Sequence, residues 1–77
     1  MVNEGKADEI IERFKKVMGP VANTLAADAG REVGVVIIDG RVQRIESEEQ
    51  YKKLVEKLRE KFSRIMGPAI TDSLITG

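Results

Sequence analysis

The chain has 77 residues, of which 42% are hydrophobic and 34% charged, and its 13 basic and 13 acidic residues give a formal charge of zero. It contains no cysteine, histidine or tryptophan. That composition excludes disulfide frameworks, thiol and histidine catalysis, and zinc sites built from these residues. A balanced charge also argues against a general nucleic-acid or anionic-membrane binder, because such proteins carry a basic excess.

The length predicts a single domain over residues 1–77 with a small core and no disulfide or zinc to reinforce it. Self-association is the remaining common route to stability. No apolar run approaches the roughly 20 residues that span a bilayer, and residues 1–6 have neither the basic region nor the apolar stretch of a secretory signal. We therefore expect a cytoplasmic protein. Abundant lysine and glutamate with few amides is typical of thermophile proteins, and no cofactor is expected.

The first predicted element is an amphipathic helix over residues 6–29. Its hydrophobic residues recur at steps of three and four, which is the spacing of one helix face. The stripe expected to face the core consists of Ile10, Ile11, Phe14, Val17, Met18, Val21, Ala22, Leu25 and Ala29. Gly30 is expected to end this helix.

A β-hairpin is predicted over residues 32–46. Asp39-Gly40 is a strong signal for a two-residue turn between strands. With that turn, Val33, Val35, Ile37 and Val42 share the core face, while Val36 and Ile38 lie on the other face beside Arg41 and Gln43. The first strand is thus apolar on both faces, as in a central strand. Because a lone hairpin has only edges, we expect another copy to pair with it or cover it.

The second predicted helix covers residues 47–75. Ser47 and Gln50 form a capping box at its start. The apolar stripe that follows consists of Tyr51, Val55, Leu58, Phe62, Ile65 and Ala69.

The two predicted helices contain matching segments. Phe14 to Ala22 recurs as Phe62 to Ile70, at an offset of 48 residues, with Met-Gly-Pro in both copies. The prolines Pro20 and Pro68 require each helix to kink or restart. Since both stripes stay in phase across the break, we expect a bend that keeps the core face. The bends, at Gly19-Pro20 and Gly67-Pro68, either shape the helices around the sheet or form a docking notch.

The segment Gly19 to Ala22, followed by Leu25, resembles Gly-Pro-containing helical segments of prokaryotic signalling and regulatory proteins. The chain is also similar to small uncharacterised archaeal proteins rich in lysine and glutamate. This resemblance implies a regulatory or scaffolding role, and it implies no catalytic residue and no ligand.

Few residues suggest a chemical site. The cluster Glu46, Glu48 and Glu49 is explained by the start of a helix, where acidic residues are favoured, so no metal site is predicted there. Arg31, Arg41 and Arg44 are the candidate ligand-binding residues, because they could form a basic patch beside the hairpin. Equally, arginines at a sheet edge discourage unwanted strand pairing.

These observations predict an α+β protein of αββα order, in which two kinked amphipathic helices flank a two-stranded antiparallel hairpin completed by oligomerisation. The leading functional hypothesis is a non-enzymatic, homo-oligomeric interaction or regulatory module, with itself and another protein as partners and without membrane or nucleic acid. A binding domain for a small anionic or phosphorylated ligand is the alternative, and an enzyme the remote one. The expected oligomer interface comprises Val36, Ile38, Gly19, Pro20, Gly67 and Pro68.

Overall fold

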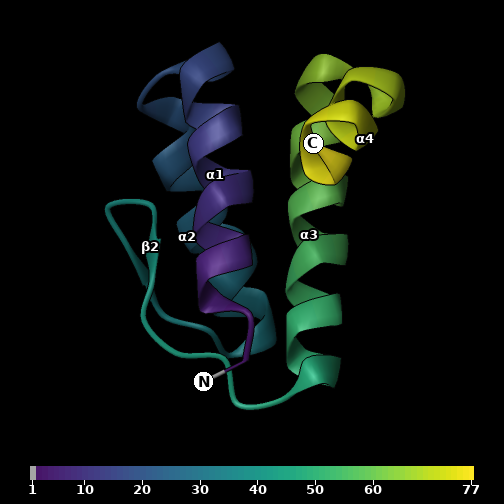
Figure 1. Ribbon diagram of the computed structural model, residues 1–77. Helices are drawn as coiled ribbons and strands as arrows, with labels where there is room; N and C mark the ends of the chain where they lie inside the picture. Colours follow the sequence, from purple (N-terminus) through teal and green to yellow (C-terminus); the bar gives the residue numbers. More distant parts are fainter. Residues whose placement is uncertain (1) are drawn as a thin grey trace.

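The computed structural model describes residues 2–77 and folds them into four helices and one small antiparallel sheet (Figure 1). The elements in chain order are α1 (Glu4–Met18), α2 (Val21–Val33), β1 (Ile37–Ile38), β2 (Arg41–Val42), α3 (Glu48–Met66) and α4 (Pro68–Thr76). The predicted combination of helices with a two-stranded antiparallel hairpin is confirmed. The arrangement is α+β, with helices predominating.

Each of the two expected long helices is divided into two at its Gly-Pro pair. Gly19 ends α1 and Gly67 ends α3, with φ angles of 74° and 86°. Their N–H groups donate to the carbonyls of Lys15 and Ser63 at 2.7 and 2.9 Å. The proline that follows lacks an N–H, which the first turn of a new helix does not need. Figure 1 shows α2 running back beside α1 and α4 folding back on α3.

The predicted bends are therefore chain reversals, and the hydrophobic stripe does not continue in phase across them. Val17 and Val21 are 58% and 53% exposed, and Ile65 is 59% exposed. Ala69 is exposed as well. The prediction that these residues face the core is wrong. Because the chain reverses at each glycine, the stripe expected along one helix is divided between two helices.

The core lies between the two helical hairpins and under the sheet. Its buried members are Ala7, Ile10, Ile11, Phe14, Ala22, Ala26, Ala29, Val35, Ile37, Val42, Ile45, Leu54, Leu58 and Phe62. The buried residues of α2 are three alanines and Gly30, and small side chains let neighbouring helices approach closely. The exposed area of 4603 Å² matches the value of about 4,650 Å² expected for a compact 8.5 kDa chain.

Two glycines set the boundary between α2 and the hairpin. Gly30 does not end the helix as expected. It lies inside α2, where a Cβ would come within 2.4 Å of the Val35 carbonyl oxygen. Gly34, with φ 78°, ends α2 by donating its N–H to the Gly30 carbonyl. Consequently residues 32 and 33 are helical, and the hairpin is shorter than predicted.

The hairpin turn has the predicted register. Asp39 and Gly40 have φ angles of 52° and 78°, and both positive values suit a two-residue hairpin turn. Ile37 pairs with Val42, and these two side chains are buried, as predicted. The hairpin is held against α1 by a side chain, because the Val42 N–H donates to Asp8 Oδ1 at 2.7 Å.

Candidate functional site

The outer face of the hairpin carries two of the predicted interface residues. Val36 and Ile38 are 60% and 57% exposed, and alternation along β1 places them opposite the buried Ile37. Because Ile37 and Val42 form a pair without mutual hydrogen bonds, the backbone N–H and C=O of Ile37 point away from β2. Exposed apolar side chains therefore lie beside the edge of β1 that does not pair with β2.

A shallow hollow of about 310 Å³ lies beside this edge of β1. Its lining residues are Ala27, Arg31, Gly34, Val35, Val36 and Ile37. We call this hollow, together with Ile38, the hairpin face. Of the residues that line the hollow, five are apolar or glycine and Arg31 is charged.

The three arginines predicted to form a basic patch are not brought together. Arg31 lies in α2 and pairs with Asp28 at 3.3 Å, while Arg44 pairs with Glu46 at 3.2 Å. Arg41 lines a different hollow from Arg31. Two of the three arginines therefore pair with nearby acidic residues, and Arg41 lies apart from Arg31 in another hollow.

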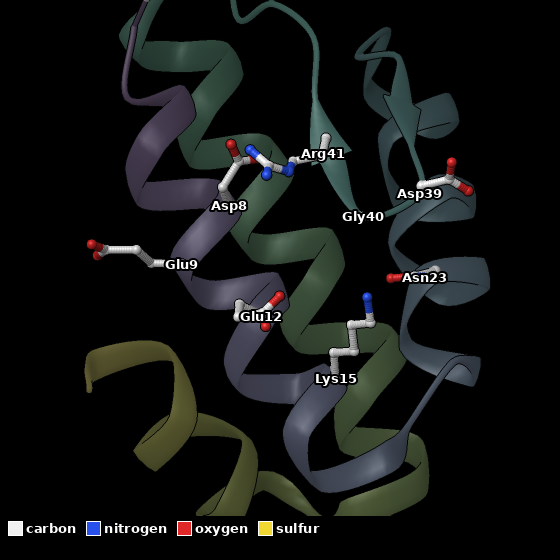
Figure 2. Close-up of a pocket in the computed structure, with 8 residues that line it drawn as sticks. All are labelled: Asp8, Glu9, Glu12, Lys15, Asn23, Asp39, Gly40 and Arg41. Atoms are coloured by element: carbon white, nitrogen blue, oxygen red, sulfur yellow. The ribbon is translucent and has the colours of Figure 1, made fainter.

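The hollow at Arg41 lies between α1, the start of α2 and the hairpin turn, and Figure 2 shows its lining residues. Its volume is about 390 Å³, and it is lined by Asp8, Glu9, Glu12, Lys15, Asn23, Asp39, Gly40 and Arg41. Four carboxylates face two cations, so the formal charge is negative and does not favour an anionic ligand. Within residues 2–77, no three carboxylates are placed to share a metal ion.

The acidic residues at the start of α3 have structural roles. The predicted capping box is formed in part: Ser47 Oγ accepts from the Gln50 N–H at 3.1 Å, whereas the Gln50 side chain reaches the residue before Ser47 and not Ser47 itself. The Gln50 side chain accepts from the Glu46 N–H at 2.7 Å and donates to the Val33 carbonyl at 3.0 Å. Both carboxylate oxygens of Glu48 accept from Asn3. This corner thus joins α3 to the end of α2 and to the N-terminal segment.

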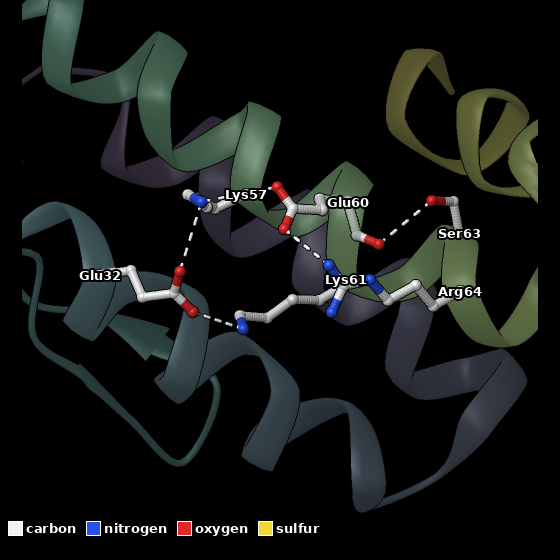
Figure 3. A network of polar contacts seen from close by, with 6 residues as sticks. All are labelled: Glu32, Lys57, Glu60, Lys61, Ser63 and Arg64. Atoms are coloured by element: carbon white, nitrogen blue, oxygen red, sulfur yellow. Dashed lines mark hydrogen bonds and ion pairs between the residues drawn. The ribbon is translucent and has the colours of Figure 1, made fainter.

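A cluster of ion pairs that the sequence did not predict joins α2 to α3 (Figure 3). Glu32 contacts Lys57 at 3.3 Å and Lys61 at 2.5 Å. Hydrogen bonds first from Lys61 and then from Lys57 hold the pKa of Glu32 below its ordinary value. The bond to Glu32 raises the pKa of Lys57. Neither shift moves a group towards neutral pH, so the cluster is suited to joining helices rather than to proton transfer.

A second exposed apolar surface lies at the two Gly-Pro turns. Val17, Val21, Ile65 and Ile70 are all more than half exposed, and Figure 1 shows both turns at the same end of the molecule. We call these four residues, together with Pro20 and Pro68, the Gly-Pro end. The sequence predicted the turns as an interface but placed Val17, Val21 and Ile65 in the core.

Comparisons with models of protein families, with curated proteins and with solved structures found no match to this chain. Among the described residues, no helix has both the length and the apolar character that a membrane crossing requires. The most distinctive surface features of the described residues are the two exposed apolar surfaces, the hairpin face and the Gly-Pro end.

Proposed function

We propose that this protein is a non-enzymatic interaction module that forms a homodimer through the hairpin face. The observation that carries the proposal is the exposure of Val36 and Ile38, at 60% and 57%, beside the outer edge of β1. An edge strand flanked by exposed apolar side chains is a ready site for pairing with another chain. Two hairpins paired in this way would make one four-stranded sheet.

A second copy is a suitable occupant because the surroundings of the hairpin face are electrically balanced. Arg31 and Arg44 each have an acidic partner. Arg41, opposite Ile38 in the hairpin, lines the hollow that carries four carboxylates. Two copies related by a two-fold axis would thus meet without a surplus of like charge. The core is already of ordinary size, so the proposal rests on this exposed face and not on a shortage of buried surface.

The edge of the sheet formed by β2 is less suited to pairing with another chain. The N–H of Val42 on β2 is bonded to Asp8 of α1, and Ile45 N–H donates to Glu4 at 2.8 Å. Carboxylates of α1 thus occupy the donors on that side. The outer edge of β1 remains beside its hollow, which favours β1–β1 pairing over β2–β2 pairing.

Sedimentation velocity at micromolar concentrations tests the proposal. We expect the native chain to sediment as a dimer and Ile38→Glu to sediment as a monomer with unchanged helical circular dichroism. Ile65→Ser is the matched control, because it replaces an equally exposed isoleucine at the Gly-Pro end. A native monomer at these concentrations, or a dimer that Ile38→Glu leaves intact, would overturn the proposal.

A further inference from the structure

Most of the exposed hydrophobic surface lies away from the hairpin face. In the part of the chain that the structure describes, six large hydrophobic side chains are exposed, and four of them belong to the Gly-Pro end. Single exposed valines are ordinary, but four large apolar side chains exposed at one end of a small protein make that end a candidate interaction site. This surface is separate from the one proposed for dimerisation.

The Gly-Pro end is also flanked by basic side chains. Lys15 and Lys16 lie in the last turn of α1, and Arg64 lies in the last turn of α3. Within residues 2–77 neither lysine has an ion pair, whereas Arg64 pairs with Glu60 at 3.1 Å. The C-terminal ends of α1 and α3 lie next to the N-terminal ends of α2 and α4. The negative and positive ends of the helix dipoles therefore offset each other there. The side chains therefore set the local charge. Lys15 lines the hollow at Arg41 together with four carboxylates, so the positive charge at this end comes from Lys16.

The acidic residue of α4 does not offset the positive charge at the Gly-Pro end. Asp72 is engaged by Arg59 at 2.9 Å. In addition, the first turns of α2 and α4 contain no acidic residue. The lysines at the end of α1 thus have no acidic partner on the adjacent helix starts.

We propose that the Gly-Pro end binds an amphipathic helix of a partner protein that carries acidic residues beside its apolar stripe. The exposed valines and isoleucines would contact the apolar stripe, and Lys16 would face the partner's carboxylates. Helix recognition of this kind uses apolar anchors for affinity and flanking charge for orientation and association rate.

Two other occupants fit the surface less well. A second copy would bring Lys16 of both chains together, and like charges at an interface oppose association. A membrane surface is usually engaged by aromatic side chains and by clusters of about four to eight basic residues. Here the only two phenylalanines stack in the core.

The test begins with selection of displayed 18-residue peptides against the native protein, because the partner's sequence is unknown. We expect enrichment of sequences with helical apolar spacing and flanking Asp or Glu. One enriched peptide is then labelled and titrated by fluorescence anisotropy. No enriched family, or enrichment of basic peptides, would overturn the proposal.

Variants locate the binding surface. Ile65→Ser and Val17→Ser are each expected to weaken binding of the labelled peptide about tenfold, as for loss of an interface anchor. Lys16→Glu is expected to weaken it, while Lys16→Arg binds as the native chain does. Lys52→Glu is the control, because Lys52 is an exposed lysine near the start of α3 and lacks an ion pair within the described residues.

Two further experiments distinguish binding of a partner helix from dimerisation and from binding to a membrane surface. Ile38→Glu is expected to abolish dimerisation and to leave peptide binding unchanged, so each proposal can fail alone. Vesicles of phosphatidylcholine with phosphatidylserine are expected to bind no native protein. Vesicle binding that Ile65→Ser abolishes would overturn the partner-helix proposal in favour of a membrane surface.

Discussion

Phe14 and Phe62 occupy equivalent positions in the two matching helical segments, and they stack on each other with ring centroids 3.8 Å apart and an interplanar angle of 4°. Both side chains are fully buried. Phe14 belongs to α1 and Phe62 to α3, so the stack joins the two helix-Gly-Pro-helix units. The two copies of the internal repeat therefore contact each other in the core, through these two rings.

Removing either phenylalanine ring is expected to destabilise the fold. Phe14→Ala and Phe62→Ala should each lower the free energy of unfolding by about 3–5 kcal/mol, because a buried ring is lost and a cavity remains. Urea unfolding followed by circular dichroism measures this change. Val17→Ala, at an exposed position of the same helix, is expected to have little effect. Near-neutral stability of both phenylalanine variants would show that the stack does not hold the units together.

Asp8 is expected to matter for stability although it lies beside an exposed hollow. Its Oδ1 atom accepts the Val42 N–H at 2.7 Å, and an unpaired backbone donor costs about 1–3 kcal/mol. Asp8→Ala should therefore lower the free energy of unfolding by that amount and speed amide exchange at Val42. Glu12→Ala is the control, since Glu12 has no hydrogen bond or ion pair within residues 2–77. Equal effects of the two alanines would contradict the proposed role of Asp8.

Two glycines in helices should respond oppositely to alanine. Gly5→Ala in α1 is expected to raise the free energy of unfolding by about 0.5–1 kcal/mol, because open space surrounds the new methyl group and alanine favours helix. Gly30→Ala should lower it by about 1–3 kcal/mol, because the methyl group would collide with the Val35 carbonyl. Thermal unfolding of both variants provides the comparison. Stabilisation by Gly30→Ala would show that β1 does not pack closely on α2.

The Glu32 cluster predicts a pH dependence on the acid side. The bonds from Lys61 and Lys57 lower the folded-state pKa of Glu32 below its ordinary value of 4.5. Its stabilising contribution is therefore present above the ordinary value and is lost as the pH falls through the lowered one. Urea unfolding at a series of pH values should show a steeper acid loss for the native chain than for Glu32→Gln.

The matched variant Glu56→Gln removes an exposed carboxylate on α3 that has no ion pair within the described residues. It should leave the acid profile of the native chain unchanged. Identical profiles for all three proteins would mean that the Glu32 cluster contributes no pH-dependent stability.

Local signals predicted the elements that local interactions determine. Asp39-Gly40 set both the turn and its register, and Ser47 with Gln50 marked the start of α3. The reversals were missed because the spacing of Val17 and Val21 reads as one continuous helix face. What interrupts that face is the positive φ of the intervening glycine, which the hydrophobic pattern does not report.

Other features depend on residues that are distant in sequence. Gly30 signals either the end of a helix or close packing, and only the position of Val35 decides between them. Asp8 and Val42 are 34 residues apart, so no local pattern could pair them. Similarly, the basic patch was expected from the clustering of Arg31, Arg41 and Arg44 in sequence, whereas Arg31 in α2 and Arg41 in β2 line different hollows.

The distance between two copies at the hairpin face is the sharpest test of dimerisation through this surface. The chain has no cysteine, so Gln43→Cys introduces a single site for a spin label on the outer face of the hairpin, with Val36 and Ile38 left intact. Pulsed electron paramagnetic resonance of this protein should give one short, narrow interchain distance. The same label at Glu56→Cys on α3 should give a longer one. Absence of an interchain signal, or a shorter distance from α3 than from the hairpin, would contradict dimerisation through the hairpin face.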